Sequence, residues 1–173
     1  MSENQRRRLD LMLEPPYLDG LSDLTMDEVQ TLHEECLDVE TELSYVRRLA
    51  QARIDIVEAE LDRRAEGGTI GDLVAALPDI LAREVAPRTD PVNSRLPQRL
   101  APDPDITFQR GLERLVTDAT LVNLPSLPEP ELRSTLEQLH QLENEVSEQR
   151  HGVHEVIDLI EAEITERHKV GRA

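Results

Sequence analysis

The sequence predicts an all-α protein built mainly from two long helices. Only three of the 173 residues are aromatic, although 38% are hydrophobic. This composition lacks the bulky side chains that fill a thick globular core, whereas Leu, Val, Ile and Ala suffice for the narrow seam between paired helices. Proline is also absent from residues 26–77 and 131–173, so each stretch has room for one long helix.

The first long helix is expected over residues 27–64. Thr25 precedes Glu28 by three residues, which is the spacing of a capping box at a helix start. The glycine pair at 67–68 is expected to end the helix, because glycine readily adopts the left-handed conformation found just past helix ends.

The second long helix is expected over residues 131–168, after Pro130, with basic residues in its last turn. A shorter helix is predicted over 70–83, bent or restarted at Pro78, and another is predicted around Phe108. Prolines between 85 and 107 indicate an extended linker. The predicted divisions are a flexible N-terminal tail (1–22), the first helix (23–66), short helices with the linker (67–130) and the second helix (131–170), in one domain.

The charge balance excludes some classes of partner. With 36 acidic and 19 basic side chains the formal charge is −17, which disfavours direct binding of nucleic acid and favours a basic protein partner. The single cysteine, Cys36, allows no internal disulfide and falls at an apolar-periodic position, so it is interpreted as a core residue. No apolar stretch is long enough to span a membrane or to act as a signal peptide, so a cytoplasmic location is expected.

An internal repeat relates the two long helices at an offset of 103 residues without a gap. The matched pairs are Leu24 with Leu127, Glu28 with Glu131, Glu40 with Glu143, Ser44 with Ser147, Arg47 with Arg150, Asp55 with Asp158, and Glu58, Ala59 and Glu60 with Glu161, Ala162 and Glu163. The repeat indicates a duplication. Two amphipathic helices of equal length joined by a long connection can pair in either direction, and a coiled-coil hairpin is predicted. The same helices could pair between chains, but the tandem arrangement favours one chain.

The repeated polar residues form one stripe on each helix. At 100 degrees per residue, Glu40, Ser44, Arg47, Gln51 and Asp55 share an arc of about 80 degrees. Apolar residues at spacings of three and four cluster beside the stripe and form the expected packing seam. The seam residues are Leu32, Cys36, Val39, Leu43, Val46, Ala50, Ile54, Val57 and Leu61 in the first helix, and Leu139, Leu142, Val146, Val153, Ile157, Ile160 and Ile164 in the second.

The stripe order E-x3-S-x2-R-x3-Q-x3-D, from Glu40 to Asp55, resembles the motif of the RsiG family of actinobacterial anti-sigma factors. The resemblance covers both motif helices and their duplication, but not the tail or the linker. It implies an antiparallel coiled coil that binds a dimer of cyclic di-GMP between its motifs. It also implies that the loaded protein sequesters a sporulation sigma factor of the WhiG type, away from RNA polymerase and promoter.

The residue types in the stripe suit such a ligand. Arginine can donate two hydrogen bonds to guanine O6 and N7 or to a phosphate, and a carboxylate can accept from guanine N1 and N2. Serine can bond a phosphate or ribose oxygen, and glutamine can donate or accept. The glutamates are expected to meet a ribose hydroxyl, a guanine donor or an arginine of the stripe. The candidate ligand-binding residues are Glu40, Ser44, Arg47, Gln51, Asp55, Glu143, Ser147, Arg150, His154 and Asp158.

The second motif departs from the pattern at His154, where glutamine is expected, and it contains Gly152. Imidazole replaces the amide only in part and titrates near pH 6.5, so it can make the affinity depend on pH. Glycine costs up to about 1 kcal/mol in a helix, which is tolerable if a ligand or partner approaches closely. The alternative is a surface glycine without consequence.

Other interpretations carry less weight. His151 and His154 lie three apart, but no third ligand at suitable spacing accompanies them, so no metal is expected. There is no glycine-rich phosphate loop and no nucleophile motif, so the protein is not expected to be an enzyme. The acidic run of Glu58, Glu60 and Asp62 is interpreted as a solvated helix face. The remaining alternatives are a coiled-coil adaptor without a ligand and a cyclic di-GMP receptor that acts on another protein.

Overall fold

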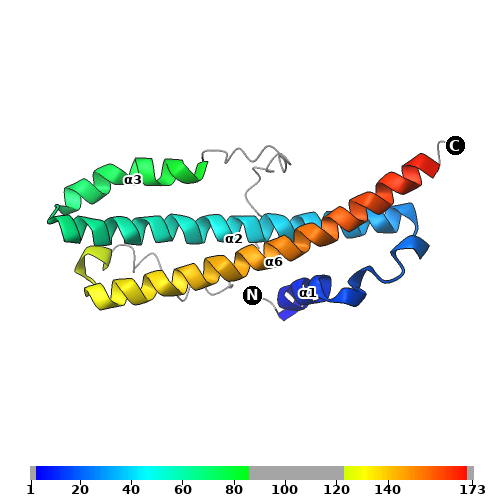
Figure 1. The fold of residues 1–173 in the computed structure, drawn as a ribbon, viewed down its shortest axis with the longest axis horizontal. Helices are drawn as coiled ribbons and strands as arrows, with labels where there is room; N and C mark the ends of the chain where they lie inside the picture. The colour runs from blue at the N-terminus through cyan, green and yellow to red at the C-terminus, as the bar shows by residue number, and fades with distance from the viewer. Residues whose placement is uncertain (1–2, 86–122, 171–173) are drawn as a thin grey trace. The chain divides into compact units, whose positions relative to one another are not determined.

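The computed structural model describes residues 3–85 and 123–170 and is helical throughout that part, without strands (Figure 1). This confirms the predicted all-α class. The elements are α1 (Glu3–Leu13), α2 (Met26–Glu66), α3 (Ile70–Val85) and α6 (Glu129–Val170), with short 3-10 helices η1 (Pro15–Leu18), η2 (Leu21–Asp23) and η3 (Leu124–Ser126). None of the described helices is long and apolar enough to cross a membrane.

The chain forms two compact units that share the two long helices. Unit 1 contains residues 1–44 and 146–173, and unit 2 contains residues 45–145. In unit 1 the first part of α2 pairs with the last part of α6, and in unit 2 the last part of α2 pairs with the first part of α6. The direction is antiparallel in both, because cross-helix pairs with rising numbers in α2 have falling numbers in α6. The predicted hairpin is therefore confirmed.

Helix α2 begins and ends as its sequence predicts. Thr25 donates its backbone N–H to Glu28 Oε2 at 2.7 Å, and Glu28 donates its own to Thr25 Oγ1 at 3.3 Å, which completes the capping box. At the other end Gly67 has φ +71°, and the Gly68 N–H donates to the Arg63 carbonyl at 2.9 Å. This is the Schellman arrangement, which satisfies carbonyls that a helix end leaves unpaired.

Helices α6 and α3 differ from the sequence prediction at their prolines. Helix α6 begins at Glu129, so Pro130 lies within its first turn, where the missing N–H has no helical partner to lose. Helix α3 begins after Thr69, whose backbone N–H donates to Asp72 Oδ2 at 2.6 Å. It continues through Pro78 instead of restarting there, and Pro78 is exposed, so its ring meets no packed neighbour.

The predicted seam forms the core of both units. In unit 1 the buried seam residues are Cys36, Val39, Leu43, Val146, Val153, Ile157 and Ile160, and in unit 2 they are Val46, Ala50, Ile54, Val57 and Leu139. Leu32, Leu61, Leu142 and Ile164 are only partly buried. Burial of Cys36 confirms its assignment to the core. It also raises the pKa of the Cys36 thiol.

The N-terminal segment differs from the prediction of a flexible tail over 1–22. Residues 3–13 form α1, in which Leu9 and Met12 are 3% and 1% exposed. Arg8 Nη2 donates to the Glu35 carbonyl of α2 at 2.7 Å. Residues 3–13 have only a few apolar side chains beside a basic run, so the sequence did not predict a packed helix. In the structure this segment lies against α2 and α6. The predicted linker over 85–107 and the helix around Phe108 lie outside the described residues.

Candidate functional site

Every residue of the two predicted motifs lies on α2 or α6, and none is fully buried. Nine of the ten are partly buried beside the seam, and Asp158 is exposed. This placement follows from the sequence, because the stripe is about 90 degrees from the centre of the apolar seam on each helix. The motif side chains are therefore held by the helix pair and remain accessible to a ligand.

Unit 1 brings together residues of both motifs around Glu40. Ser44 Oγ donates to Glu40 Oε1 at 2.7 Å, and His154 Nε2 of α6 lies 3.3 Å from the same oxygen. The remaining unit 1 members of the motifs are Ser147, Arg150 and Asp158. Glu40 thus joins a serine of its own helix to the opposite helix, at the position where the second motif departs from glutamine.

Unit 2 contains the other four members, of which Arg47 and Glu143 meet across the helix pair. Arg47 Nη1 lies 3.5 Å from Glu143 Oε1, and the two side chains are 23% and 19% exposed. Gln51 Nε2 donates to Asp55 Oδ1 at 2.9 Å along α2. Of the partners expected for the glutamates, an arginine of the stripe is the one that the structure shows for Glu143.

Both motif glutamates therefore have a partner on the opposite helix. Glu40 meets His154 in unit 1, and Glu143 meets Arg47 in unit 2, each across the helix pair. A partly exposed ion pair contributes only about 0–1 kcal/mol. The arrangement offers guanidinium and amide donors together with carboxylate acceptors, which are the groups that guanine recognition uses.

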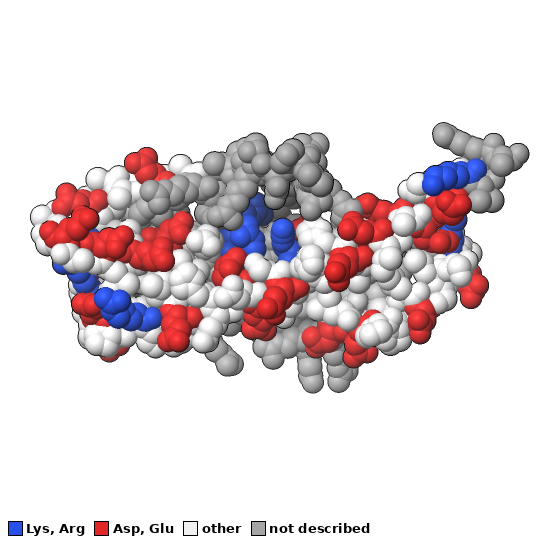
Figure 2. Space-filling model, viewed as in Figure 1, with Lys and Arg blue, Asp and Glu red and all other residues white. Residues whose placement is uncertain are grey.

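The molecule as a whole is strongly acidic. Figure 2 shows Asp and Glu in many separate patches on the face in view, and Lys and Arg in fewer places, some of them grouped together. This distribution agrees with the formal charge of −17. No group of three or more His, Cys, Asp and Glu side chains in the described ranges is placed to hold a metal ion.

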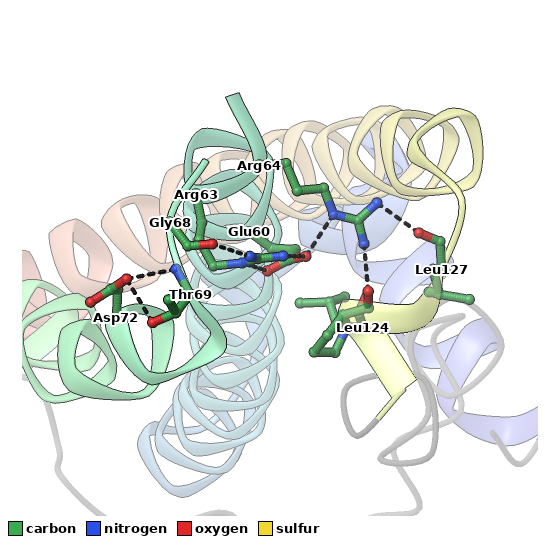
Figure 3. A network of polar contacts seen from close by, with 9 residues as sticks. Glu60, Arg63, Arg64, Gly68, Thr69, Asp72, Leu124 and Leu127 are labelled. Carbon is green, nitrogen blue, oxygen red and sulfur yellow. Dashed lines mark hydrogen bonds and ion pairs between the residues drawn. The ribbon is translucent and has the colours of Figure 1, made fainter. Parts of the chain in front are cut away.

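The largest departure from the sequence interpretation is Glu60. Glu58 and Asp62 are exposed as predicted, but Glu60 is 0% exposed, so its assignment to a solvated face is wrong. Arg63 donates to both Glu60 oxygens at 2.7 and 2.8 Å, and Arg64 Nε donates to Oε1 at 2.6 Å (Figure 3). These hydrogen bonds, chiefly those from Arg63, hold the pKa of Glu60 below its ordinary value although burial opposes them.

The spacing around Glu60 could have indicated the network. Basic residues three and four positions after a glutamate lie on the same face of a helix and can both reach it. Exposed pairs of this kind are common, however, as with Arg133 and Glu129, whose side chains are 68% and 52% exposed. The sequence spacing alone does not distinguish an exposed pair from a buried one.

Gly152 has a structural role that the sequence left open. A Cβ added there would lie 2.6 Å from Leu13 Cδ2, at the end of α1. On the helical wheel Gly152 is about 180 degrees from Glu143, so it lies on the side of α6 away from the motif stripe. The close partner is therefore a helix of the same chain, and the interpretation as a surface glycine without consequence is wrong.

The fold and the duplicated motifs define a class of helical hairpins with a stripe of polar residues beside an apolar seam. Among curated proteins no match to the sequence is found. The family model described as RsiG-like matches residues 15–81 and 118–173, which is more than half of the chain. The chain therefore belongs to the RsiG-like family of anti-sigma regulators, and the family implies a sigma factor as its partner.

Proposed function

We propose that the protein binds cyclic di-GMP through its two motifs and, in that state, sequesters a WhiG-type sporulation sigma factor. The observation that supports this most strongly is the duplicated E-x3-S-x2-R-x3-Q-x3-D stripe, whose members meet across the helix pair in both units. A coiled coil that needs only solubility has no reason to repeat serine and arginine at the same offsets. Membership of the RsiG-like family adds the sigma factor as the class of partner.

Each type of motif residue binds a different chemical group of the ligand. Arg47 and Arg150 donate to guanine O6 and N7 or to phosphate, and Asp55 and Asp158 accept from the guanine N1 and N2 donors. Ser44 and Ser147 are short enough to let the ligand lie against the helices. Binding moves Arg47 from Glu143 to the nucleotide, and since the existing contact is 3.5 Å long and partly exposed, little is lost.

The sigma factor is bound by the helix pair and the nucleotide together. A surplus of acidic side chains speeds the encounter with the basic DNA-binding regions of such a factor. Occupation of those regions excludes promoter DNA. Linkage then requires that the sigma factor raise the affinity for cyclic di-GMP by the same factor by which the nucleotide raises the affinity for the sigma factor.

Calorimetric titration of cyclic di-GMP into the whole chain tests the ligand, with cyclic di-AMP as competitor. The Arg47→Ala, Arg150→Ala double variant should weaken binding about 100-fold or more, because each bidentate contact contributes roughly 1–3 kcal/mol. Replacement of both by Lys should also weaken it strongly. Arg133→Ala removes an exposed arginine of α6 outside the motifs and should leave affinity unchanged.

The partner is tested by co-purification of a WhiG-type sigma factor with and without cyclic di-GMP. Capture that requires the nucleotide supports the proposal. Absence of any heat with cyclic di-GMP, both alone and with the sigma factor present, would leave a ligand-independent coiled-coil adaptor. Nucleotide binding without sigma capture would instead indicate a cyclic di-GMP receptor that acts on another protein.

A further inference from the structure

Two arginines outside the motifs make the same set of contacts in the two units. In unit 2, Arg64 Nε donates to Glu60, and its two terminal nitrogens reach the carbonyls of Leu127 at 2.7 Å and Leu124 at 3.0 Å (Figure 3). Nη2 also lies 3.2 Å from the Pro125 carbonyl. Arg64 therefore ties the last turns of α2 to η3, just before α6 begins.

Unit 1 contains the same arrangement at its own end. Arg167 Nε donates to Glu163 at 2.6 Å, and its terminal nitrogens reach the carbonyls of Leu24 at 2.7 Å and Leu21 at 2.8 Å. These carbonyls belong to η2 and the residue after it, just before α2 begins. Arg167 thus ties the last turns of α6 to the turn that starts its neighbour.

Each group in one arrangement lies 103 residues from its counterpart in the other. The counterparts are Glu60 and Glu163, Arg64 and Arg167, Leu21 and Leu124, and Leu24 and Leu127, and η2 and η3 span equivalent residues. We call each set an end clamp. The duplication therefore includes the turn before each helix and the arginine that meets it, as well as the motif.

An end clamp specifies one register of the helix pair, which an aliphatic seam alone does not. Leu, Val, Ile and Ala side chains of similar shape allow paired helices to slide in steps that keep the seam closed, whereas a buried polar contact satisfies its partners in one register only. The planar guanidinium fixes three donor directions at once, toward one carboxylate and two carbonyls. A displaced register would leave these carbonyls without their donors.

We propose that Arg64 and Arg167 are positioning residues that set the register of α2 against α6, each within its own unit, and so place the motif residues opposite one another. Arg47 precedes Arg64 by 17 residues, about 26 Å along the helix, so Arg64 acts on the motif through the helix and not by contact. The consequence for ligand affinity rests on the function proposed above. The effect on register does not.

The experiment measures register directly. Nitroxide labels are placed on exposed or half-exposed positions of the two helices within one unit, at Glu58→Cys and His140→Cys for unit 2, in a Cys36→Ala background. For unit 1 the labels are at Glu34→Cys and Ala162→Cys. A shift of one heptad moves one label by about 10 Å along the helix, which changes the measured distance distribution.

Arg64→Ala should broaden or shift the unit 2 distribution and weaken cyclic di-GMP binding about tenfold, because a binding group needs placement within roughly 0.5 Å. Arg167→Ala should do the same to the unit 1 distribution. Arg64→Lys, which keeps the charge but reaches fewer partners, should give a smaller change and serves if the alanine variant does not fold. Arg133→Ala is the matched control and should change neither quantity.

A lowered melting temperature with unchanged distance distributions and unchanged nucleotide affinity would overturn the proposal, because it would show that the clamps only stabilise the fold. If the unmodified protein does not bind cyclic di-GMP, the proposed function fails while the distance distributions still decide the register. If the distributions shift but affinity holds, the clamps set register and the ligand does not depend on it, which refutes the second half of the proposal.

Discussion

Each end clamp contains an equivalent arginine, but the carboxylates that pair with the two arginines differ in burial and in number of partners. In unit 2 Glu60 is fully buried and holds both Arg63 and Arg64, and Arg63 also donates to the Gly68 carbonyl at 2.6 Å. In unit 1 Glu163 is 27% exposed and pairs with Arg167, while Glu166 occupies the position equivalent to Arg63 and pairs with Lys169. A buried charge needs full pairing, whereas a partly solvated one does not.

The additional arginine of unit 2 connects α2 to the segment that follows it. After α2 the chain turns through Gly67 and Gly68 into α3, and Arg63 donates to the Gly68 carbonyl in that turn. At the equivalent position α6 carries Glu166, which pairs with Lys169 of its own helix. The arginine that has an equivalent in both clamps can therefore be assigned to the helix pair, and Arg63 can be assigned to the junction with α3.

The largest expected effect is that of removing the carboxylate from each clamp. Glu60→Ala leaves two arginines facing each other without an anion and should lower the free energy of unfolding by about 3 kcal/mol. Glu163→Ala removes a partly exposed partner and should lower it by no more than about 1 kcal/mol. Urea denaturation of the whole chain measures both. Equal losses would contradict the distinction between the clamps.

The buried carboxylate also predicts a dependence on pH. The folded-state pKa of Glu60 is held below its ordinary value, so the group contributes stability above the unfolded value, about 4.3, and loses it as pH falls through the folded value. The stability difference between the unmodified protein and Glu60→Gln should therefore be constant near pH 7 and shrink below about pH 4. A difference that grew on acidification would exclude this account.

The close approach of Leu13 to Gly152 distinguishes α6 from α2, where the matched position is Leu49. Alanine at 152 improves helix propensity by about 1 kcal/mol but collides with Leu13. Gly152→Ala alone should gain less than this, because the end of the exposed Leu13 side chain must shift to make room, whereas in a Leu13→Ala background it should stabilise by about 1 kcal/mol. A double-mutant cycle by thermal denaturation gives both numbers. An equal gain in both backgrounds would show that α1 does not rest on Gly152.

The two long helices also differ at their starts, where an effect of similar size is expected. Helix α2 has the capping box of Thr25 and Glu28, while residue 128, the equivalent of Thr25 before α6, is proline. Thr25→Ala should cost about 1 kcal/mol, because it leaves a helix donor unpaired. Thr31→Ala, which removes a threonine from the exposed face of the same helix, is the control and should be nearly neutral.

Much of the fold could be predicted from periodicity. Some features depend only on neighbouring residues along one helix, so they can be predicted without knowing what the helix packs against. These features are the helix class, the capping box, the glycine stop and most of the buried seam. The ten motif residues were likewise predicted on one stripe per helix, and the structure confirms their place beside the seam. Their binding of cyclic di-GMP stays a prediction.

The failures all concern residues whose surroundings come from elsewhere in the chain. Residues 3–13 carried too few apolar positions to predict a packed helix, because their packing surface is formed by α2 and α6. Arg64 and Arg167 are ordinary last-turn arginines in sequence, and only the position of η3 and η2 gives them carbonyls to hold. Gly152 was ambiguous for the same reason.

The amino-acid sequence alone predicts two amphipathic helices, their duplication at 103 residues and the polar stripe beside each seam. These are local, periodic features, and a helix of 3.6 residues per turn places them without reference to any partner. The burial of Glu60, the contact of α1 with Gly152 and the arginine at the end of each helix pair depend on how the helices pack in three dimensions. Burial and long-range hydrogen bonding depend on which segments lie side by side in the folded chain. The local sequence around a residue does not show which distant residues it will contact.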